Sequence, residues 1–193
     1  MVDVVVVGSG IAGLFVATRC ARSGLSTIVV TKKKLTDSST NWAQGGIAAS
    51  LFPDGIESHV NDTLAAGGGL CNESVVRFVV EEARMRIDDL VKSGVQFDLK
   101  DESYDLTMEG GHSAKRILHS KDATGAEIER ALIEEANSSD NLTMLEEHMA
   151  IDLILEEKDA EIKKIVGIWV LNPSGEVQTI SAQAVILASG GAG

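Results

Sequence analysis

The stretch Val4-Val5-Val6-Val7-Gly8-Ser9-Gly10-Ile11-Ala12-Gly13 decides the fold. Its four consecutive valines predict a short strand buried on both faces, as is typical of parallel sheets. Apolar residues then recur at helical spacing from Leu14 to Ala21, and Gly24 is expected to end that helix. A second β-branched run, Thr27–Thr31, completes a βαβ unit of about 30 residues. The pattern predicts an α/β fold of the Rossmann-like type.

The glycine motif at the end of the first strand predicts a dinucleotide site. The first glycine suits a tight turn, the second lets the backbone approach a pyrophosphate, and the third lets the helix pack closely on the strand. The helix N-terminus also offers free N–H groups to phosphates. A glycine-rich turn with no ligand is the alternative. The predicted contacts are Gly8, Ser9, Gly10, Ile11, Ala12 and Gly13.

An acidic residue usually follows the second strand of such a unit and binds the ribose. Here Thr31 and Lys32 occupy that place, which argues against a generic NAD-binding protein.

The remainder of the chain alternates helical and strand patterns. Apolar spacing predicts an amphipathic helix over Glu73–Lys92 and another that begins with a capping box at Thr124. The last third predicts a β-meander followed by one more buried strand, which should join the first two in a parallel sheet with its glycine-rich loop at the same edge. The expected strands are Ala150–Leu155, Ile162–Leu171, Val177–Ile180 and Ala184–Leu187, with a hairpin turn at Asn172–Gly175. The expected loops are Asp37–Gly46, opening into a short helix, and Lys100–Gly111.

Composition excludes several classes of protein. The 193 residues carry a formal net charge of −12, which disfavours a nucleic-acid surface. Cys20 and Cys71 are expected to be reduced thiols, and the histidines show no metal-ligand spacing, so no metal is expected. No stretch suggests a membrane span or a signal peptide, which makes the cytoplasm the expected location.

Two polar segments are candidates for ligand binding. Ser38–Ala49 combines hydroxyl and amide side chains with Gly45-Gly46, where the backbone could approach a flat ring. Glu109-Gly110-Gly111-His112-Ser113, followed by Arg116 and His119, brings together groups that suit a carboxylate ligand. Solvated surface loops are the alternative for both segments.

Together these motifs resemble the flavoprotein superfamily of succinate dehydrogenases, fumarate reductases and L-aspartate oxidases, from Val4 to Gly193. The resemblance implies that the Gly8–Gly13 turn binds the FAD pyrophosphate and that Ser39–Gly46 wraps the flavin. It also implies that Ala188-Ser189-Gly190-Gly191 closes the cofactor site. The further FAD contacts that it implies are Lys32, Ser39, Thr40, Asn41, Trp42, Ala43, Gln44, Gly45, Gly46, Ala150, Ser189 and Gly190.

Two positions distinguish branches of this superfamily. Members that hold the flavin covalently have a histidine where this chain has Ser39, so the resemblance implies non-covalent FAD. Glu109 stands where the dicarboxylate enzymes carry an apolar residue, and this resembles the L-aspartate oxidase branch. There the acid is placed to meet the substrate ammonium group, and His112 could lie near a substrate carboxylate.

The implied reaction oxidises L-aspartate to iminoaspartate, with O2 or fumarate as electron acceptor. Its product feeds quinolinate and NAD biosynthesis, with a possible transfer to quinolinate synthase. The resemblance places the catalytic arginine beyond Gly193, so 1–193 is expected to be a truncated FAD-binding domain that is inactive alone, with 95–125 starting a capping segment. A soluble fumarate reductase and a non-catalytic FAD-binding fragment are the alternatives.

Overall fold

The computed structural model describes the backbone of residues 1–159 and 162–191, and the side chains of these residues except those from 157 to 163. The chain divides into two compact units. The first unit comprises Met1–Trp42 with Glu129–Gly193, and the second comprises Ala43–Ile128.

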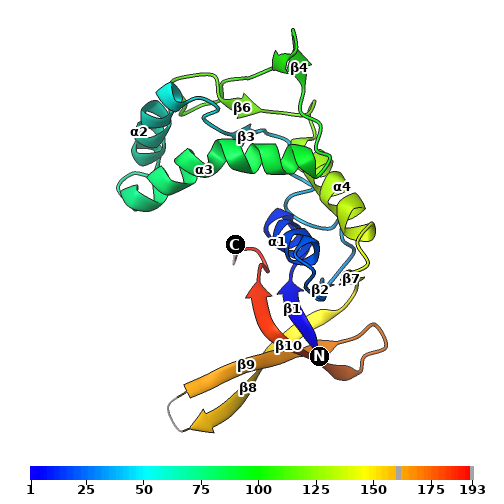
Figure 1. Ribbon diagram of the computed structural model, residues 1–193. Helices are drawn as coiled ribbons and strands as arrows, with labels where there is room; N and C mark the ends of the chain where they lie inside the picture. Colours follow the sequence, from blue (N-terminus) through cyan, green and yellow to red (C-terminus); the bar gives the residue numbers. More distant parts are fainter. Residues whose placement is uncertain (160–161, 192–193) are drawn as a thin grey trace. The chain divides into compact units, whose positions relative to one another are not determined.

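The described part of the first unit is built on a six-stranded sheet in the order β7-β2-β1-β10-β9-β8 (Figure 1). The strands are β1 (Val2–Val7), β2 (Thr27–Val30), β7 (Leu142–Leu145), β8 (Met149–Asp159), β9 (Ile162–Leu171) and β10 (Val177–Leu187). Strands β7, β2, β1 and β10 pair in parallel, and β8 and β9 continue the sheet in antiparallel fashion. Val7 lies opposite both Val30 and Leu187, so the predicted adjacency of the three parallel strands is confirmed.

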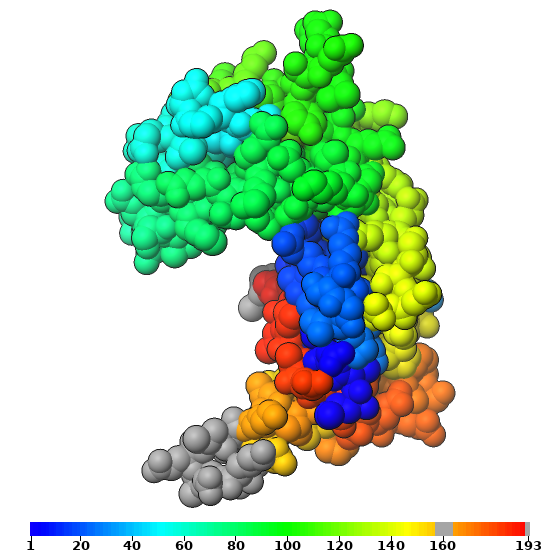
Figure 2. Space-filling view, in the orientation of Figure 1, coloured from blue at the N-terminus to red at the C-terminus, as the bar shows by residue number. Residues whose placement is uncertain are grey.

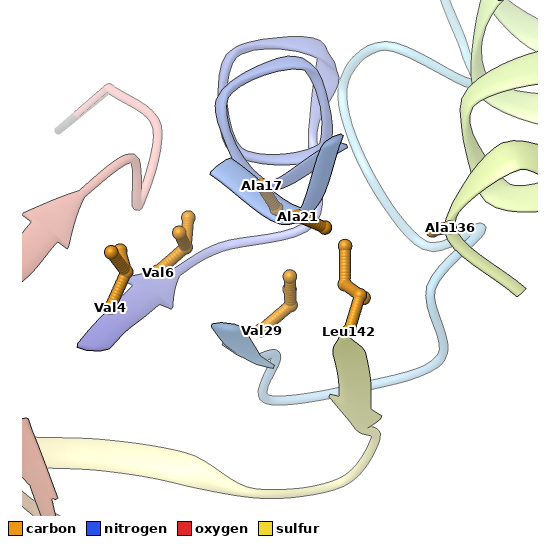
Figure 3. Packing of buried hydrophobic residues seen from close by; sticks show 7 residues of the cluster. All are labelled: Val4, Val6, Ala17, Ala21, Val29, Ala136 and Leu142. Carbon is orange, nitrogen blue, oxygen red and sulfur yellow. The ribbon is translucent and has the colours of Figure 1, made fainter. Parts of the chain in front are cut away.

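The valine run of β1 supplies both faces of the sheet. Val4 and Val6 belong to one apolar cluster and Val5 to another. Figure 3 shows the first cluster, in which strand valines lie below two small residues of helix α1 (Ile11–Arg22), Ala17 and Ala21. Full burial of one such valine contributes roughly 1.5–3 kcal/mol. The small residues on α1 let the helix lie close to the strands, which fixes where its N-terminus meets β1.

Strand β10 corrects the prediction of two separate strands, Val177–Ile180 and Ala184–Leu187. It is continuous, and it changes partner along its length (Figure 1). From Val177 to Ser181 it pairs antiparallel with β9, and from Ala182 onward it pairs parallel with β1. The intervening residues include no glycine, proline or asparagine to make a turn, so the chain stays extended.

The second unit holds two long helices that lie side by side in Figure 1 and Figure 2. They are α2 (Ile56–Ala66), which follows a 3-10 turn at Pro53–Gly55, and α3 (Glu73–Lys92). Arg77 of α3 makes a two-pronged ion pair with Glu57 of α2. Two short ribbons complete the unit: β3 (Ile47–Ala48) with β6 (Ile117–Leu118), and β4 (Leu99–Lys100) with β5 (Ser103–Tyr104).

Helix α3 has the predicted boundaries, with Asn72 as its N-cap. Helix α4 (Thr124–Asn137) also begins at the predicted residue. The Thr124 hydroxyl accepts a hydrogen bond from Ser120 N, and Glu127 Oε1 accepts one from Gln96 N. The short helix expected where the loop Asp37–Gly46 ends is not found at that point, because turns lead directly into β3.

Candidate cofactor and substrate sites

The glycine-rich turn is shaped by contacts that only glycine allows. Gly8 has φ +110, and a Cβ on it would collide with the Ala188 carbonyl. A Cβ on Gly13 would collide with the Gly8 carbonyl, so Gly13 lets α1 rest directly on the turn. These are the roles predicted for the first and third glycines of the motif.

The N-terminus of α1 suits a diphosphate. Gly10 is its N-cap with extended backbone, and the first turn contains no acidic residue. The Ile11 N–H donates to Thr40 Oγ1 at 3.0 Å, whereas the next N–H groups of a helix have no intrahelical acceptor. The positive end of the helix dipole is therefore offered to an anion without competition from a carboxylate in that turn.

A pair of hydroxyl groups lies at the end of β2, where an acidic residue that binds the ribose is usually found. Ser9 Oγ lies 3.0 Å from Thr31 Oγ1 and 3.2 Å from the Leu35 carbonyl oxygen. Ser9 and Thr31 are buried, whereas Lys32 is exposed. The Ser9 hydroxyl thus connects the glycine-rich turn to the end of β2. Of the two residues that follow the strand, Thr31 is buried, and the exposed Lys32 is the one whose side chain can face a ligand.

The carboxyl ends of β1 and β10 bring two predicted cofactor segments to one edge of the sheet. Val7 pairs with Leu187, and the Ala188 N–H donates to the Val7 carbonyl at 2.8 Å. Ser189 and Gly190 therefore leave the sheet beside Gly8, as predicted. Ala150 is placed differently, because it pairs with Val170 and packs against the second apolar cluster of the sheet.

The predicted flavin-wrapping segment is divided between the two units. Ser39 and Trp42 are exposed in the first, and Asn41 N donates to Ser38 Oγ at 3.2 Å. In the second unit Ala43 and Gln44 are also exposed, and a Cβ on Gly46 would collide with Ile117 and Leu118. A Cβ on Gly45 would lie 3.5 Å from Glu109 Oε1. The structure thus places the Glu109 carboxylate against the Gly45 backbone.

Arg116 organises the loop that carries Glu109 and His112. Its guanidinium is buried and donates to Asp62 Oδ2 at 2.5 Å, to Ser58 Oγ at 2.9 Å and to His112 Nδ1 at 3.0 Å. Asp62 also accepts the Ser113 N–H and hydroxyl at 2.7 and 2.8 Å. Hydrogen bonds from Arg116 and Ser113 hold the pKa of the Asp62 carboxyl well below its usual range.

The network fixes the tautomer of His112. A guanidinium only donates, so Nδ1 must accept and the ring proton is assigned to Nε2. His59 lies beside it, with ring centroids 5.8 Å apart, and its Nδ1 lies 3.2 Å from Ser50 Oγ. Burial, followed by the charge of Arg116, lowers the pKa of His59. His112 therefore presents an Nε2–H donor, and it lies beside a His59 ring whose charged form is disfavoured.

The prediction that Arg116 and His119 serve the same ligand needs correction. Arg116 is already paired with Asp62, so its charge is used inside the protein. His119 belongs to a separate pair, because its Nδ1 lies 3.0 Å from Asp98 Oδ2. Asp62 and Ser58 were missed in the sequence. Their spacing of four residues becomes informative only once α2 is known to be a helix.

Within residues 1–159 and 162–191, no group of three or more His, Cys, Asp or Glu side chains is arranged to hold a metal ion. Among the same residues, no helix has both the length and the apolar character needed to cross a membrane.

The comparison with family models decides the identity of the domain. The model described as an FAD binding domain matches residues 3–193. The chain belongs to the FAD binding domain family. Its cofactor is FAD, and the open helix N-terminus and the glycine cradle of the first unit fit the diphosphate of that group.

Similar sequences from bacteria and plants are named L-aspartate oxidase. The chain is 47% identical to an L-aspartate oxidase of Vibrio cholerae over 199 residues, covering 98% of this chain and 37% of the relative. It is 44% identical to a chloroplastic L-aspartate oxidase of Arabidopsis thaliana, covering 99% of this chain and 30% of the relative. The chain thus spans well under half the length of these curated relatives.

Solved structures share the fold. The quinol fumarate reductase of E. coli matches with a TM-score of 0.88 at 28% identity, covering 100% of this chain and 33% of that one. The Sdh1 complex of Mycobacterium smegmatis matches with a TM-score of 0.87 at 31% identity, covering 98% and 34%. The predicted Rossmann-like FAD-binding fold is confirmed.

Proposed function

We propose that this chain is the FAD-binding part of an L-aspartate oxidase. In this proposal the enzyme acts in the cytoplasm and converts L-aspartate to iminoaspartate, with O2 or fumarate as electron acceptor. Its product enters pyridine nucleotide biosynthesis, with transfer to a quinolinate synthase. The names of the similar sequences support the assignment. The structural observation that carries it is the Glu109 carboxylate against Gly45.

The position of Glu109 suits an amine ligand. Gly45 belongs to the segment proposed to wrap the flavin, so the carboxylate lies where a substrate nitrogen would approach that segment. A carboxylate that accepts from an ammonium group makes a charge-assisted hydrogen bond of about 1.5–3 kcal/mol. Glu109 thereby favours an amino acid over a dicarboxylate that lacks the amine.

His112 suits the other end of the substrate. Its Nε2–H donates to a carboxylate oxygen, while Arg116 and Asp62 hold the ring in place. In the oxidation Cα loses a hydride and the nitrogen loses a proton, and bound FAD supplies the hydride acceptor. Glu109 and His112 orient the substrate and exchange no electrons with it. The arginine and further substrate ligands implied by the resemblance are proposed to lie outside these 193 residues.

A soluble fumarate reductase is the second candidate, because a fumarate reductase shares this fold at 28% identity. A fumarate dianion gains nothing from Glu109 and is repelled by it. A non-catalytic FAD-binding fragment is the third candidate, and it predicts that the protein turns over neither substrate.

Replacing Glu109→Gln in the full-length protein separates these candidates. We expect aspartate oxidation to fall by roughly 10–100-fold in kcat/KM, since one charge-assisted hydrogen bond is weakened. Fumarate reduction should stay constant or improve, and FAD content should stay normal. Glu102→Gln, an exposed acid in the same part of the chain, is the matched control. An equal loss with both substrates would show that Glu109 only supports its loop.

The cofactor is expected to be held without a covalent bond, because a serine at position 39 cannot form a histidyl–flavin linkage. Acid denaturation followed by filtration should release all the yellow colour from the polypeptide. Colour retained with the protein would contradict this prediction.

A further inference from the structure

Glu129 is a buried acid that the proposed function leaves unused. It lies within α4, and only 1% of its surface is exposed. Three apolar residues close to it in the sequence are also buried, namely Ile128, Ala131 and Leu132. A carboxyl in such a position is costly unless it makes specific hydrogen bonds.

Among the residues that the structure describes, one of its two oxygens has a hydrogen-bond partner. Ser38 Oγ lies 2.5 Å from Glu129 Oε1, a distance typical of a strong O–H···O contact. Oε2 is buried and has no hydrogen-bond partner among the residues that the structure describes. Burial raises the pKa of Glu129, and the Ser38 hydrogen bond opposes this change. The hydrogen bond of this carboxylate is thus made with a hydroxyl that lies 91 positions earlier in the chain.

That hydroxyl closes a turn in the segment assigned to the cofactor. Ser38 Oγ also accepts the Asn41 N–H at 3.2 Å, so the residues between them are held in a turn. Thr40 lies in this turn, and its hydroxyl accepts the Ile11 N–H at 3.0 Å. The hydrogen bonds thus run from Glu129 through Ser38 to the turn that caps the helix at the phosphate-binding end of α1.

We propose that Glu129 is a positioning residue for FAD, which acts through Ser38 to hold the Ser38–Asn41 turn against the N-terminus of α1. Glu129 does not contact the cofactor in this proposal. It orders the turn before FAD arrives, so that the binding free energy is not spent on ordering it. The inference rests on FAD binding alone and is independent of whether the substrate is aspartate.

The test compares two replacements of Glu129 in the full-length protein. Glu129→Leu removes the acceptor, and Glu129→Gln retains one. We expect Glu129→Leu to raise the Kd for FAD about tenfold or more, measured by fluorescence titration of apoprotein. Glu129→Gln should stay within about threefold of the parent. The thermal midpoint of the Glu129→Leu apoprotein should not fall, since replacing a poorly paired buried acid by an apolar group is often neutral or stabilising.

Three further variants complete the design. Ser38→Ala should weaken FAD binding as Glu129→Leu does, and the double variant should be no worse than either single one, because both break one path. Glu134→Gln, on the exposed side of the same helix beside Arg130, is the control and should bind FAD normally. Unchanged FAD affinity in Ser38→Ala, or additive losses in the double variant, would overturn the proposal. If Glu129→Leu does not fold, Ser38→Ala and Glu129→Gln still decide the question.

Discussion

The glycine-rich turn of the first unit and the Glu109–Arg116 loop of the second are both assigned to ligand binding, but they are built in opposite ways. The turn uses backbone conformation and close approach, with no charged side chain in its first helical turn. The loop has open space around Gly110 and Gly111, and its form depends on a side-chain network centred on Arg116. A binding site can therefore be held in shape by the absence of side chains, as in the turn, or by paired side chains, as in the loop. The two kinds of site are disrupted by different substitutions.

The largest effect is expected from Gly13→Ala. The new methyl group would collide with the Gly8 carbonyl, so α1 must move away from β1. Overpacking of this kind costs about 1–3 kcal/mol or more, and we expect FAD affinity to fall at least about 100-fold as the cradle opens. Gly110→Ala, where a methyl group meets open space, should bind FAD normally. Normal FAD binding by Gly13→Ala would show that the turn tolerates side chains after all.

Asp62→Asn should have a smaller effect, directed at the other region. It removes the anionic acceptor of Arg116 and Ser113, and hydrogen bonds to charged groups are stronger than those between neutral groups. The free energy of unfolding, measured by urea titration, should therefore fall. FAD affinity should fall far less than in Gly13→Ala. Equal damage to both properties would contradict the division between the two regions.

The same residue gives the sign of a pH effect. The pKa of Asp62 is lowered in the folded protein, so the ion pair adds stability above the ordinary carboxyl pKa. That contribution begins to decline as the pH falls below the ordinary carboxyl pKa, and it is fully lost only below the lowered pKa of the folded protein. The advantage of the parent protein over Asp62→Asn should therefore shrink progressively as the pH falls from roughly 5 to 2. A difference between the two proteins that stays constant across this window would rule out Asp62 as the titrating group.

The smallest effect is expected from Thr40→Val, which returns to the turn. It removes the acceptor of the Ile11 N–H while keeping the shape of the side chain. Loss of a helix cap costs about 1 kcal/mol, equivalent to roughly fivefold in FAD affinity. Thr36→Val, an exposed threonine of the preceding segment, is the control. An unchanged Kd for FAD in Thr40→Val would show that the cap is dispensable.

The difference between the regions also explains what the sequence could predict. The turn depends on residues within a few positions of one another. Its glycines indicate the local structure because a side chain at Gly8 or Gly13 would collide with the backbone. The loop depends on Asp62 and Arg116, which are 54 positions apart, and no local pattern indicates that they meet. Helix α2 was not predicted because it contains serine, histidine, asparagine and threonine, with only His59 and Val60 buried.

Strand β7 was not predicted because it has four residues and only Leu142 is buried, so its periodicity is too short to recognise. The continuity of β10 was missed for a related reason. Its two halves have different partners, and each half resembles a strand of its own. Longer segments with a regular pattern throughout, such as α3 and β9, were predicted to the residue.

The pairing of β1 with β10 sets the order in which the molecule can be completed during synthesis. Asp3 and Gln183 are hydrogen-bonded partners 180 positions apart. At translation rates of about 5–20 residues per second, roughly 10–40 s pass between the synthesis of β1 and the synthesis of β10. Until then the nascent chain exposes an unpaired edge of consecutive valines, which is an aggregation hazard. Strand β1, which leads into the cofactor site, is therefore a segment to which a chaperone is expected to bind during synthesis.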